Sequence, residues 1–143
     1  MSAYGESPIR MDAPTLRISF EQNPHAPSLA RAAIMGFSDG REIPPAKLAT
    51  LTLLVSEIVT NAVIHSGAAP HSEILLCARL LDQSAVRVEV IDRGGGFTPV
   101  PRDPNRPGGG YGLYLVDKEA ERWGVDREGG TRVWFELATT TSH

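Results

Sequence analysis

Hydrophobic and polar positions change their spacing several times along the first half of the chain. The segment "TLRISFE" (residues 15–21) alternates and is rich in β-branched side chains, which predicts a strand. The segment "SLARAAIMGFSDG" (residues 28–40) has a helical period and ends on a glycine. The longest helical pattern covers residues 42–67, with two prolines near its start and a glycine at its end. One strand followed by two helices is therefore expected.

The second half of the chain predicts mostly strands. Residues 71–82 and 85–93 are two apolar runs separated by a short turn at Asp82–Ser84, which is typical of a hairpin. Residues 111–124 return to a helical period, and residues 125–138 form a strand, a Gly-Gly turn and another strand. The order β-α-α-β-β-α-β-β predicts an α+β fold. We expect a two-layer sandwich with helices on one face of a mixed, largely antiparallel sheet.

A segment rich in glycine and proline separates the two parts of this pattern. The stretch "GGGFTPVPRDPNRPGGG" (residues 94–110) holds six glycines and four prolines in seventeen residues, which excludes a regular element. A loop of this length inside a compact domain is usually functional or disordered. Residues 1–13 lack periodicity and are expected to be flexible, and residues 14–139 are expected to form a single domain.

Composition and charge exclude several classes of protein. The 143 residues are 41% hydrophobic and 22% charged, with a formal net charge of −3, so no basic field for nucleic acid is present. The single cysteine, Cys77, lies in an apolar run and is expected to be a buried, inert thiol, which suits a reducing cytoplasm. We find no apolar stretch that approaches the 18 residues needed to cross a membrane.

Polar residues follow one direction of the longest predicted helix. Glu57 and Asn61 are four residues apart, so they project about 40° from one another, and His65 continues the line by another turn. Considered alone, this line is also compatible with a solvated polar face. Trp123 and Trp134 are expected in the core.

Two glycine-rich segments favour a site over a solvated face. Asp92 opens a D-x-G-x-G pattern directly after a strand, and residues 108–113 ("GGGYGL") open a helix. Free N–H groups at a glycine-lined helix start can bind an anion, and glycines let a phosphate approach the backbone. No G-K-[ST] follows, which excludes a Walker loop, and no strand precedes the second segment as a dinucleotide-binding unit requires.

Four segments in this order resemble a known family. "SEIVTNAVIH", "DRGGGF", "GGGYGL" and "GGTRVWFEL" are similar to the N, G1 and G2 boxes and the closing Gly-Thr motif of the GHKL ATPases, the histidine-kinase-like ATP-binding proteins. The resemblance covers about residues 15–138 and implies a Bergerat-type ATP-binding fold. The small size and the lack of an attached domain resemble the anti-sigma-factor serine kinases, in particular stand-alone actinobacterial regulators.

This resemblance implies a role for each matching residue. Asp92 would accept a hydrogen bond from the adenine amine, and Thr131 would support the same base edge. Asn61 would bind Mg²⁺ through its amide oxygen, and Glu57 would orient or deprotonate the attacking hydroxyl or water. Residues 97–110 would form the ATP lid. The remaining nucleotide-binding positions would be Gly94, Gly96, Gly108, Gly110, Tyr111, Gly112 and Leu113.

The resemblance also implies an activity and partners. It points to a cytoplasmic, Mg·ATP-dependent serine/threonine protein kinase and anti-sigma regulatory factor that phosphorylates a small STAS-type anti-sigma-factor antagonist. The alternatives are a non-catalytic, ATP-binding regulator of a sigma factor or antagonist, and simple ATP hydrolysis coupled to lid motion. A homodimer fits the family, but no sequence feature demands one. Neither nucleic acid nor a membrane is an expected partner.

Some features depart from the family or stay open. The lid is short and rich in proline, and no phosphoacceptor helix of a histidine kinase is present, so autophosphorylation on histidine is not expected. Arg102 and Arg106 either contact phosphates or keep the loop solvated, and Arg93 faces either the nucleotide or solvent. His65 either touches the site or is structural.

Overall fold

The computed structural model describes residues 15–65, 72–82, 84–92, 112–127 and 130–140. These residues form three helices and five strands, in the order expected from the sequence. The elements are β2 (Thr15–Glu21), α1 (Ala26–Ser38), α2 (Pro45–His65), β3 (Glu73–Leu81), β4 (Ala85–Asp92), α3 (Gly112–Glu119), β5 (Arg122–Asp126) and β6 (Thr131–Ala138).

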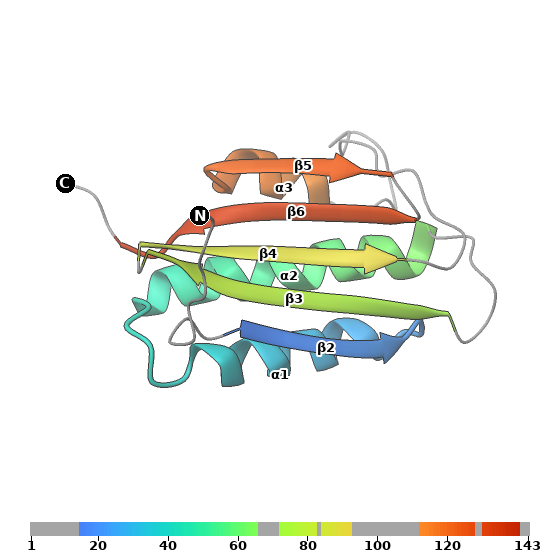
Figure 1. The fold of residues 1–143 in the computed structure, drawn as a ribbon, viewed down its shortest axis with the longest axis horizontal. Helices are drawn as coiled ribbons and strands as arrows, with labels where there is room; N and C mark the ends of the chain where they lie inside the picture. The colour runs from blue at the N-terminus through green and yellow to red at the C-terminus, as the bar shows by residue number, and fades with distance from the viewer. Residues whose placement is uncertain (1–14, 66–71, 83, 93–111, 128–129, 141–143) are drawn as a thin grey trace, which may run out of the picture.

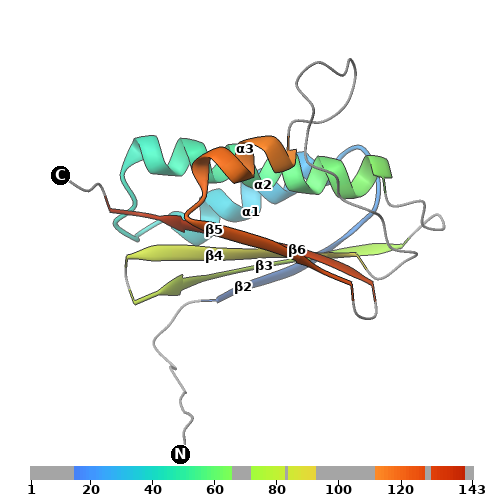
Figure 2. The same ribbon diagram turned by 90° about the horizontal axis from the view of Figure 1, so that it is seen from above.

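The strands form one sheet with the order β2-β3-β4-β6-β5, and each neighbouring pair is antiparallel. All three helices cover the same face of this sheet, and the other face carries no helix from the described part of the chain (Figures 1 and 2). The α2 helix lies in the middle of the helical layer, between α1 and α3. This arrangement confirms the α+β sandwich, with a sheet that is antiparallel at every described pairing.

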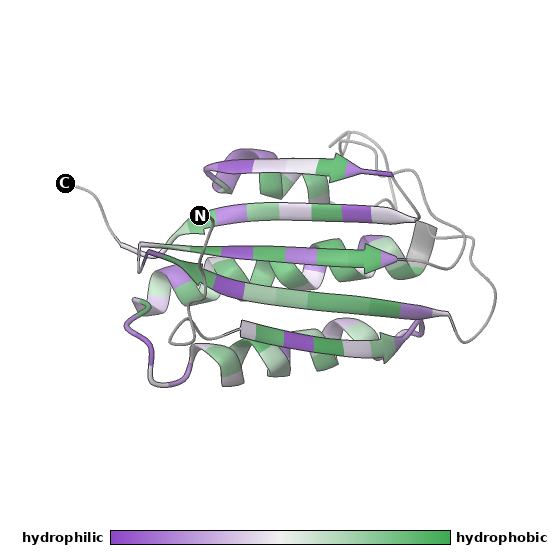
Figure 3. Cartoon of the chain, viewed as in Figure 1, coloured by the Kyte–Doolittle hydropathy of each residue, from purple (hydrophilic) through white to green (hydrophobic). Residues whose placement is uncertain are grey.

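Alternation along the strands decides which side chains reach the core. On β4, Val86, Val88 and Val90 are fully buried beneath the helices, and the intervening residues point to the open face. Figure 3 shows the same change between hydrophobic and hydrophilic positions along β4 and β6. Burying each such valine stabilises the fold by about 1.5–3 kcal/mol before entropic costs. The period of two therefore fixes which face the helices cover.

The α2 helix is more apolar than our reading of the sequence allowed. Pro45–Val63 spans 19 residues with a mean hydropathy of 1.3, so on length and composition it could cross a membrane, contrary to the expectation that no stretch comes close. In this fold the same segment is packed against α1, α3 and the sheet. The central helix of a core is as apolar as a membrane-spanning helix because most of its sides contact other parts of the protein.

The third helix is shorter than its sequence pattern suggested. We expected a helix over residues 111–124, but α3 ends at Glu119 and β5 begins at Arg122. Strand pairing outweighs the helical period here, because Trp123 and Val125 can face the core only from a strand opposite Phe135 and Val133. Tertiary contacts therefore override the local preference.

Trp134 corrects a second expectation. It is only partly buried and lies on the open face of the sheet, not in the core, because its neighbours Val133 and Phe135 take the helix-facing positions. The Arg87 guanidinium packs over its ring at 4.1 Å from the ring centroid. Trp123, by contrast, packs against the core cluster from a partly buried position.

Gly124 leaves the space that the Trp134 indole occupies. A Cβ at Gly124 would lie 2.8 Å from Nε1 of Trp134 and 2.9 Å from two of its ring carbons. We expect Gly124→Ala to lower the free energy of unfolding by about 1–3 kcal/mol, because the indole and its Arg87 contact must move. Thermal or urea unfolding measures this change.

Gly36 offers the matched control for this prediction. It lies inside α1, and a Cβ there would meet nothing within 4 Å. Gly36→Ala should therefore leave stability unchanged or raise it by about 0.5–1 kcal/mol. Equal effects of the two substitutions would contradict the steric argument.

Glu136 anchors a network of ion pairs on the open face. Its carboxylate accepts hydrogen bonds from Arg122 (2.6 Å) and Arg87 (2.7 Å), and only 9% of its side chain is exposed. Burial alone would raise the pKa of Glu136, but the hydrogen bonds from Arg122 and Arg87 outweigh it and hold the pKa below the ordinary 4.5.

This network predicts a pH dependence. Because the folded pKa of Glu136 is lowered, its stabilisation is complete above the unfolded pKa and is lost as the pH falls through the folded value. We expect Glu136→Gln to lower the free energy of unfolding by about 1–3 kcal/mol at pH 7 and less below pH 4. Urea unfolding of both proteins across this range measures the difference. A difference that does not depend on pH would contradict the prediction.

Candidate functional site

A buried polar pair lies at one end of β4 and β6, on the face of the sheet that the helices cover. Asp92 is the last residue of β4 and lies directly opposite Thr131, the first residue of β6. Asp92 is fully buried and Thr131 is 2% exposed. The next rows along the same face are apolar pairs: Val90–Val133, Val88–Phe135 and Val86–Leu137. Since burying polar groups costs free energy, this pair departs from what core packing alone would select.

Glu57 and Asn61 lie one turn apart on α2. Asn61 is buried with 8% exposure, and Glu57 is half-buried. The intervening residues Ile58 and Val59 point into the core and fix the rotation of the helix. Because these neighbours hold the helix in place, both polar side chains are presented from a rigid element.

Gln22 fixes the end of α2 relative to the sheet. Its side-chain amide donates to the backbone carbonyls of Ala62 (3.4 Å) and Val63 (3.5 Å). Gln22 directly follows β2, whose last residue pairs with the first of β3, and the next residue of β3 pairs with Asp92. The turn of α2 that carries Asn61 therefore lies at the same end of the sandwich as Asp92.

The first turn of α3 lies at this end as well. Figure 1 shows α3 starting on the side where β4 ends and α2 ends. Gly112 is the first residue of the helix, and the Leu113 side chain is 2% exposed within the core. Leu113 therefore anchors the helix start by packing, and the contribution of its backbone to phosphate binding stays a prediction. The first-turn N–H groups of a helix have no partner within the helix.

Several predicted site residues lie outside the residues that the structure describes. These are Gly94, Gly96, Gly108, Gly110 and Tyr111, together with Arg93 and the proposed lid at residues 97–110 with Arg102 and Arg106. His65 belongs to the last turn of α2. The structure thus places Asn61, Asp92 and Thr131 toward one end of the sandwich, with Glu57 one helical turn before Asn61 on α2.

Acidic and metal-ligating side chains are sparse here. Among the described residues, no three His, Cys, Asp or Glu side chains gather into a group that could hold a metal ion. Among the described residues, the Asn61 amide oxygen is a candidate Mg²⁺ ligand, to be completed by water and the oxygens of a ligand. That donor set is one Mg²⁺ accepts, since it prefers hard oxygen ligands and keeps several waters.

Two contacts around the site were not foreseen from the sequence. One is the Gln22 link to α2, and the other is a hydrogen bond of 2.8 Å from Arg31 of α1 to the Ser56 hydroxyl of α2. The second contact gives Ser56 a structural role beside Glu57. Both join residues at least 25 positions apart, so no local pattern could have revealed them.

Comparisons with known proteins agree with the fold of this chain. The search of curated protein sequences gives no match. Among solved structures, one similar chain comes from the crystal structure of the RsbU and RsbW domains of Rv1364c from Mycobacterium tuberculosis. The two structures superpose with a TM-score of 0.69 and 22% sequence identity, and the match covers 90% of this chain and 34% of that one. Another is a histidine kinase domain from the Erythrobacter litoralis EL346 blue-light activated histidine kinase, with a TM-score of 0.50 and 25% identity.

The match to the histidine kinase domain covers 77% of this chain and 61% of that one. This chain therefore spans about a third of the Rv1364c chain and about three fifths of the histidine kinase chain. The family model described as "Histidine kinase-like ATPase domain" matches residues 20–137, well over half of the sequence. The chain belongs to the family of histidine kinase-like ATPase domains.

Proposed function

We propose that this protein is a cytoplasmic, Mg·ATP-dependent serine/threonine protein kinase of the anti-sigma type. It transfers the γ-phosphoryl group of ATP to a serine or threonine of a small STAS-type anti-sigma-factor antagonist. Membership of an ATPase domain family implies ATP binding. The likeness to a chain that contains an RsbW domain supports the more specific proposal.

The observation that carries ATP binding is the buried Asp92–Thr131 pair. A carboxylate can accept a hydrogen bond from the exocyclic amine of adenine, whereas guanine presents a carbonyl at that position. Thr131 has a hydroxyl that can donate or accept beside it. A base bound here would add a hydrogen bond to a charged acceptor at this buried end of the sheet.

Glu57 and Asn61 are proposed to act at the phosphate end. Asn61 would hold Mg²⁺ through its amide oxygen, and the ion would supply charge neutralisation for the phosphates when bound. The Glu57 carboxylate orients the acceptor hydroxyl and takes its proton. The serine oxygen forms a bond to the γ-phosphorus, the bond from that phosphorus to the bridging oxygen breaks, and ADP leaves with that oxygen.

Phosphorylation is proposed to switch the antagonist. A phosphoserine adds roughly −1.5 to −2 charges at pH 7, which repels or reorders a surface that fitted its partner before modification. This would change whether the antagonist binds its regulator and, through it, a sigma factor.

The test incubates the purified protein with γ-labelled ATP, Mg²⁺ and each STAS-type protein of the source organism. Label on a serine or threonine of one of them is the expected result, with ADP released in equal amount. Binding of ATP without transfer to any of them would favour the non-catalytic regulator. Release of phosphate without protein labelling would favour simple ATP hydrolysis. The absence of ATP binding would overturn the proposal as a whole.

A further inference from the structure

The open face of the sheet carries a cavity over β2, β3 and β4. Its volume is about 200 Å³, and its lining is formed by Thr15, Arg17, Cys77, Ala78, Arg79, Arg87 and Glu89. Arg17 lies directly opposite Cys77, and Arg79, two residues further along β3, lies directly opposite Arg87. The strand register therefore brings guanidinium groups from three neighbouring strands to one place.

Arg79 occupies a position that is unfavourable for the sheet. It directly faces Arg87, and like charges at directly opposite positions destabilise a sheet. Arg79 is exposed, and within the described ranges it forms no ion pair with a carboxylate. The stability of the sheet alone does not account for an arginine at this position, whereas a bound anion would.

Glu89 contributes a carboxylate to the lining, but its charge is already balanced. It accepts a hydrogen bond of 2.8 Å from Arg87, and Arg132 lies 3.4 Å away on its other side. Arg87 also donates to Glu136 at 2.7 Å and packs over the Trp134 ring. These contacts hold Arg87 in place as a fixed wall of the cavity.

The other two arginines leave an excess of positive charge in the cavity. Arg17 is exposed like Arg79, and neither pairs with a carboxylate in the described part of the chain. Nη1 of Arg17 lies 3.6 Å from Sγ of Cys77, so its guanidinium lies against the lining. Guanidinium groups bind phosphate through paired N–H···O hydrogen bonds, so this arrangement favours a phosphate group.

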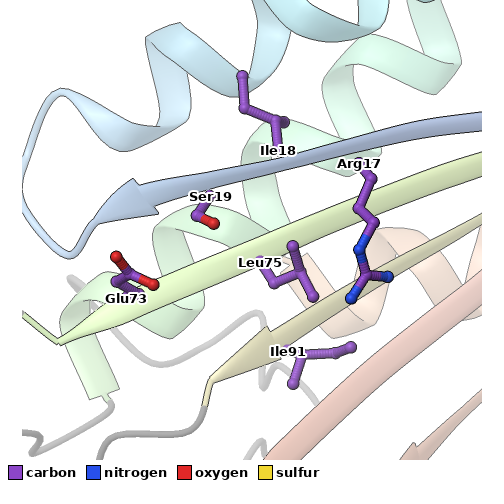
Figure 4. Close-up of a pocket in the computed structure, with 6 residues that line it drawn as sticks. All are labelled: Arg17, Ile18, Ser19, Glu73, Leu75 and Ile91. Carbon is purple, nitrogen blue, oxygen red and sulfur yellow. The ribbon is translucent and has the colours of Figure 1, made fainter.

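A second hollow shares Arg17 with the cavity. It has a volume of about 320 Å³ and is lined by Arg17, Ile18, Ser19, Glu73, Leu75 and Ile91. Figure 4 shows Leu75 and Ile91 beside the Arg17 side chain, with Glu73 at the end of the hollow away from it. Leu75 and Ile91 are half-buried on the open face and supply apolar surface. A ligand that reaches both hollows would have an anionic head at the arginines and an apolar body.

We propose that this part of the open face binds a small organic phosphate. The phosphate group lies among the three arginines of the cavity, and the organic part lies against Leu75 and Ile91. The site is on the opposite face of the sheet from Asp92 and Thr131 and uses none of the residues assigned to ATP. Its failure in a test would leave the kinase proposal intact.

Cys77 provides a local reporter for this site. It is the single cysteine of the chain and is half-buried in the lining, which corrects the expectation of a buried thiol. The rate constant for its alkylation by anionic iodoacetate is divided by that for neutral iodoacetamide. Because the same thiol reacts in both cases, this ratio measures the attraction of the cavity for an anion.

Arg79→Gln should lower this ratio by about threefold or more, because it removes an unbalanced cation from the cavity. Arg127→Gln is the matched control. Arg127 is exposed and follows β5 at the far edge of the sheet, so the same substitution there should leave the ratio unchanged. Equal ratios in the unmodified protein and Arg79→Gln would overturn the proposal.

Protection of Cys77 from iodoacetamide tests the ligand itself. At constant ionic strength, inorganic phosphate should slow the alkylation, and Arg79→Gln should require about tenfold more phosphate for the same protection. Phenyl phosphate should protect at a concentration about threefold lower than inorganic phosphate, because its ring can lie on the apolar surface. Leu75→Gln should remove this advantage and keep the protection by inorganic phosphate.

The outcomes separate the two parts of the proposal. Alkylation that phosphate does not slow, or equal protection in Arg79→Gln, would overturn the phosphate site. Equal potency of phosphate and phenyl phosphate would overturn the assignment of the organic part. Without phosphate, Arg79→Gln should raise the urea midpoint, because it removes the like-charge contact with Arg87. A lower midpoint would contradict the argument that Arg79 serves a ligand.

Discussion

Glu57→Gln is expected to reduce phosphoryl transfer by about 10²- to 10⁴-fold while leaving ATP affinity within about twofold of the unmodified protein. The amide keeps the shape of the half-buried side chain but cannot accept the proton of an attacking hydroxyl. Since Ile58 and Val59, which directly follow Glu57, pack into the core, the exchange should not disturb the helix. Single-turnover transfer from γ-labelled ATP measures the rate, and calorimetry measures the affinity.

Glu42→Gln is the matched control for this experiment. Glu42 is exposed and lies just before the start of α2, so it undergoes the same carboxylate-to-amide change at a distance from the candidate site. It should leave both transfer and binding unchanged. Transfer at the original rate in Glu57→Gln would contradict the assignment of the base. Loss of ATP binding would instead assign Glu57 to nucleotide positioning.

Asp92→Asn is expected to weaken ATP binding roughly 10- to 100-fold, because a hydrogen bond to a charged group contributes about 1.5–3 kcal/mol. The change is nearly isosteric, so the packing of the fully buried side chain is kept. An amide can also donate to the carbonyl of guanine, so the preference for ATP over GTP should narrow. Titration with a fluorescent ATP analogue, in competition with ATP and GTP, measures both effects.

Asp82→Asn controls for the chemical change in Asp92→Asn. Asp82 lies at the turn between β3 and β4, at the other end of the hairpin from Asp92, and its φ of 40° is one that asparagine also adopts readily. Nucleotide affinity should be unchanged in this variant. Unchanged affinity in Asp92→Asn, or an equal loss in both, would contradict the role of Asp92 in binding adenine.

Local patterns predicted most of the elements. The alternation of residues 15–21 matched β2 to the residue, and the helical period of residues 42–67 was confirmed as α2 (Pro45–His65). The D-x-G-x-G pattern that Asp92 opens after a strand, the glycine-rich start of the helix at residues 108–113 and the Glu-x-x-x-Asn spacing together marked the candidate site. These signals are local, because they depend only on the period of a strand or a helix. The functional assignments of these four residues stay predictions.

The wrong predictions concern positions whose secondary structure or sheet face is set by residues far away in the sequence. The helix expected over residues 111–124 ended at Glu119, because β6 offers β5 a pairing partner. Trp134 is large and aromatic, which suggests a core position. The alternation of side chains along β6 nevertheless places it on the open face, where it packs under Arg87. Membrane-like hydropathy in Pro45–Val63 has the same origin, since a helix packed on both flanks needs few charges.

The chain's own periodicity was sufficient for the α+β class and the order of the elements, because these follow from backbone geometry within a few residues. The placement of the Asn61 turn at the same end of the sandwich as Asp92 depended on the Gln22 hydrogen bond to Ala62, across 40 positions, and on the strand register. The Glu136 network arose in the same way. Such pairs are selected by packing and strand register, which no short stretch of sequence contains.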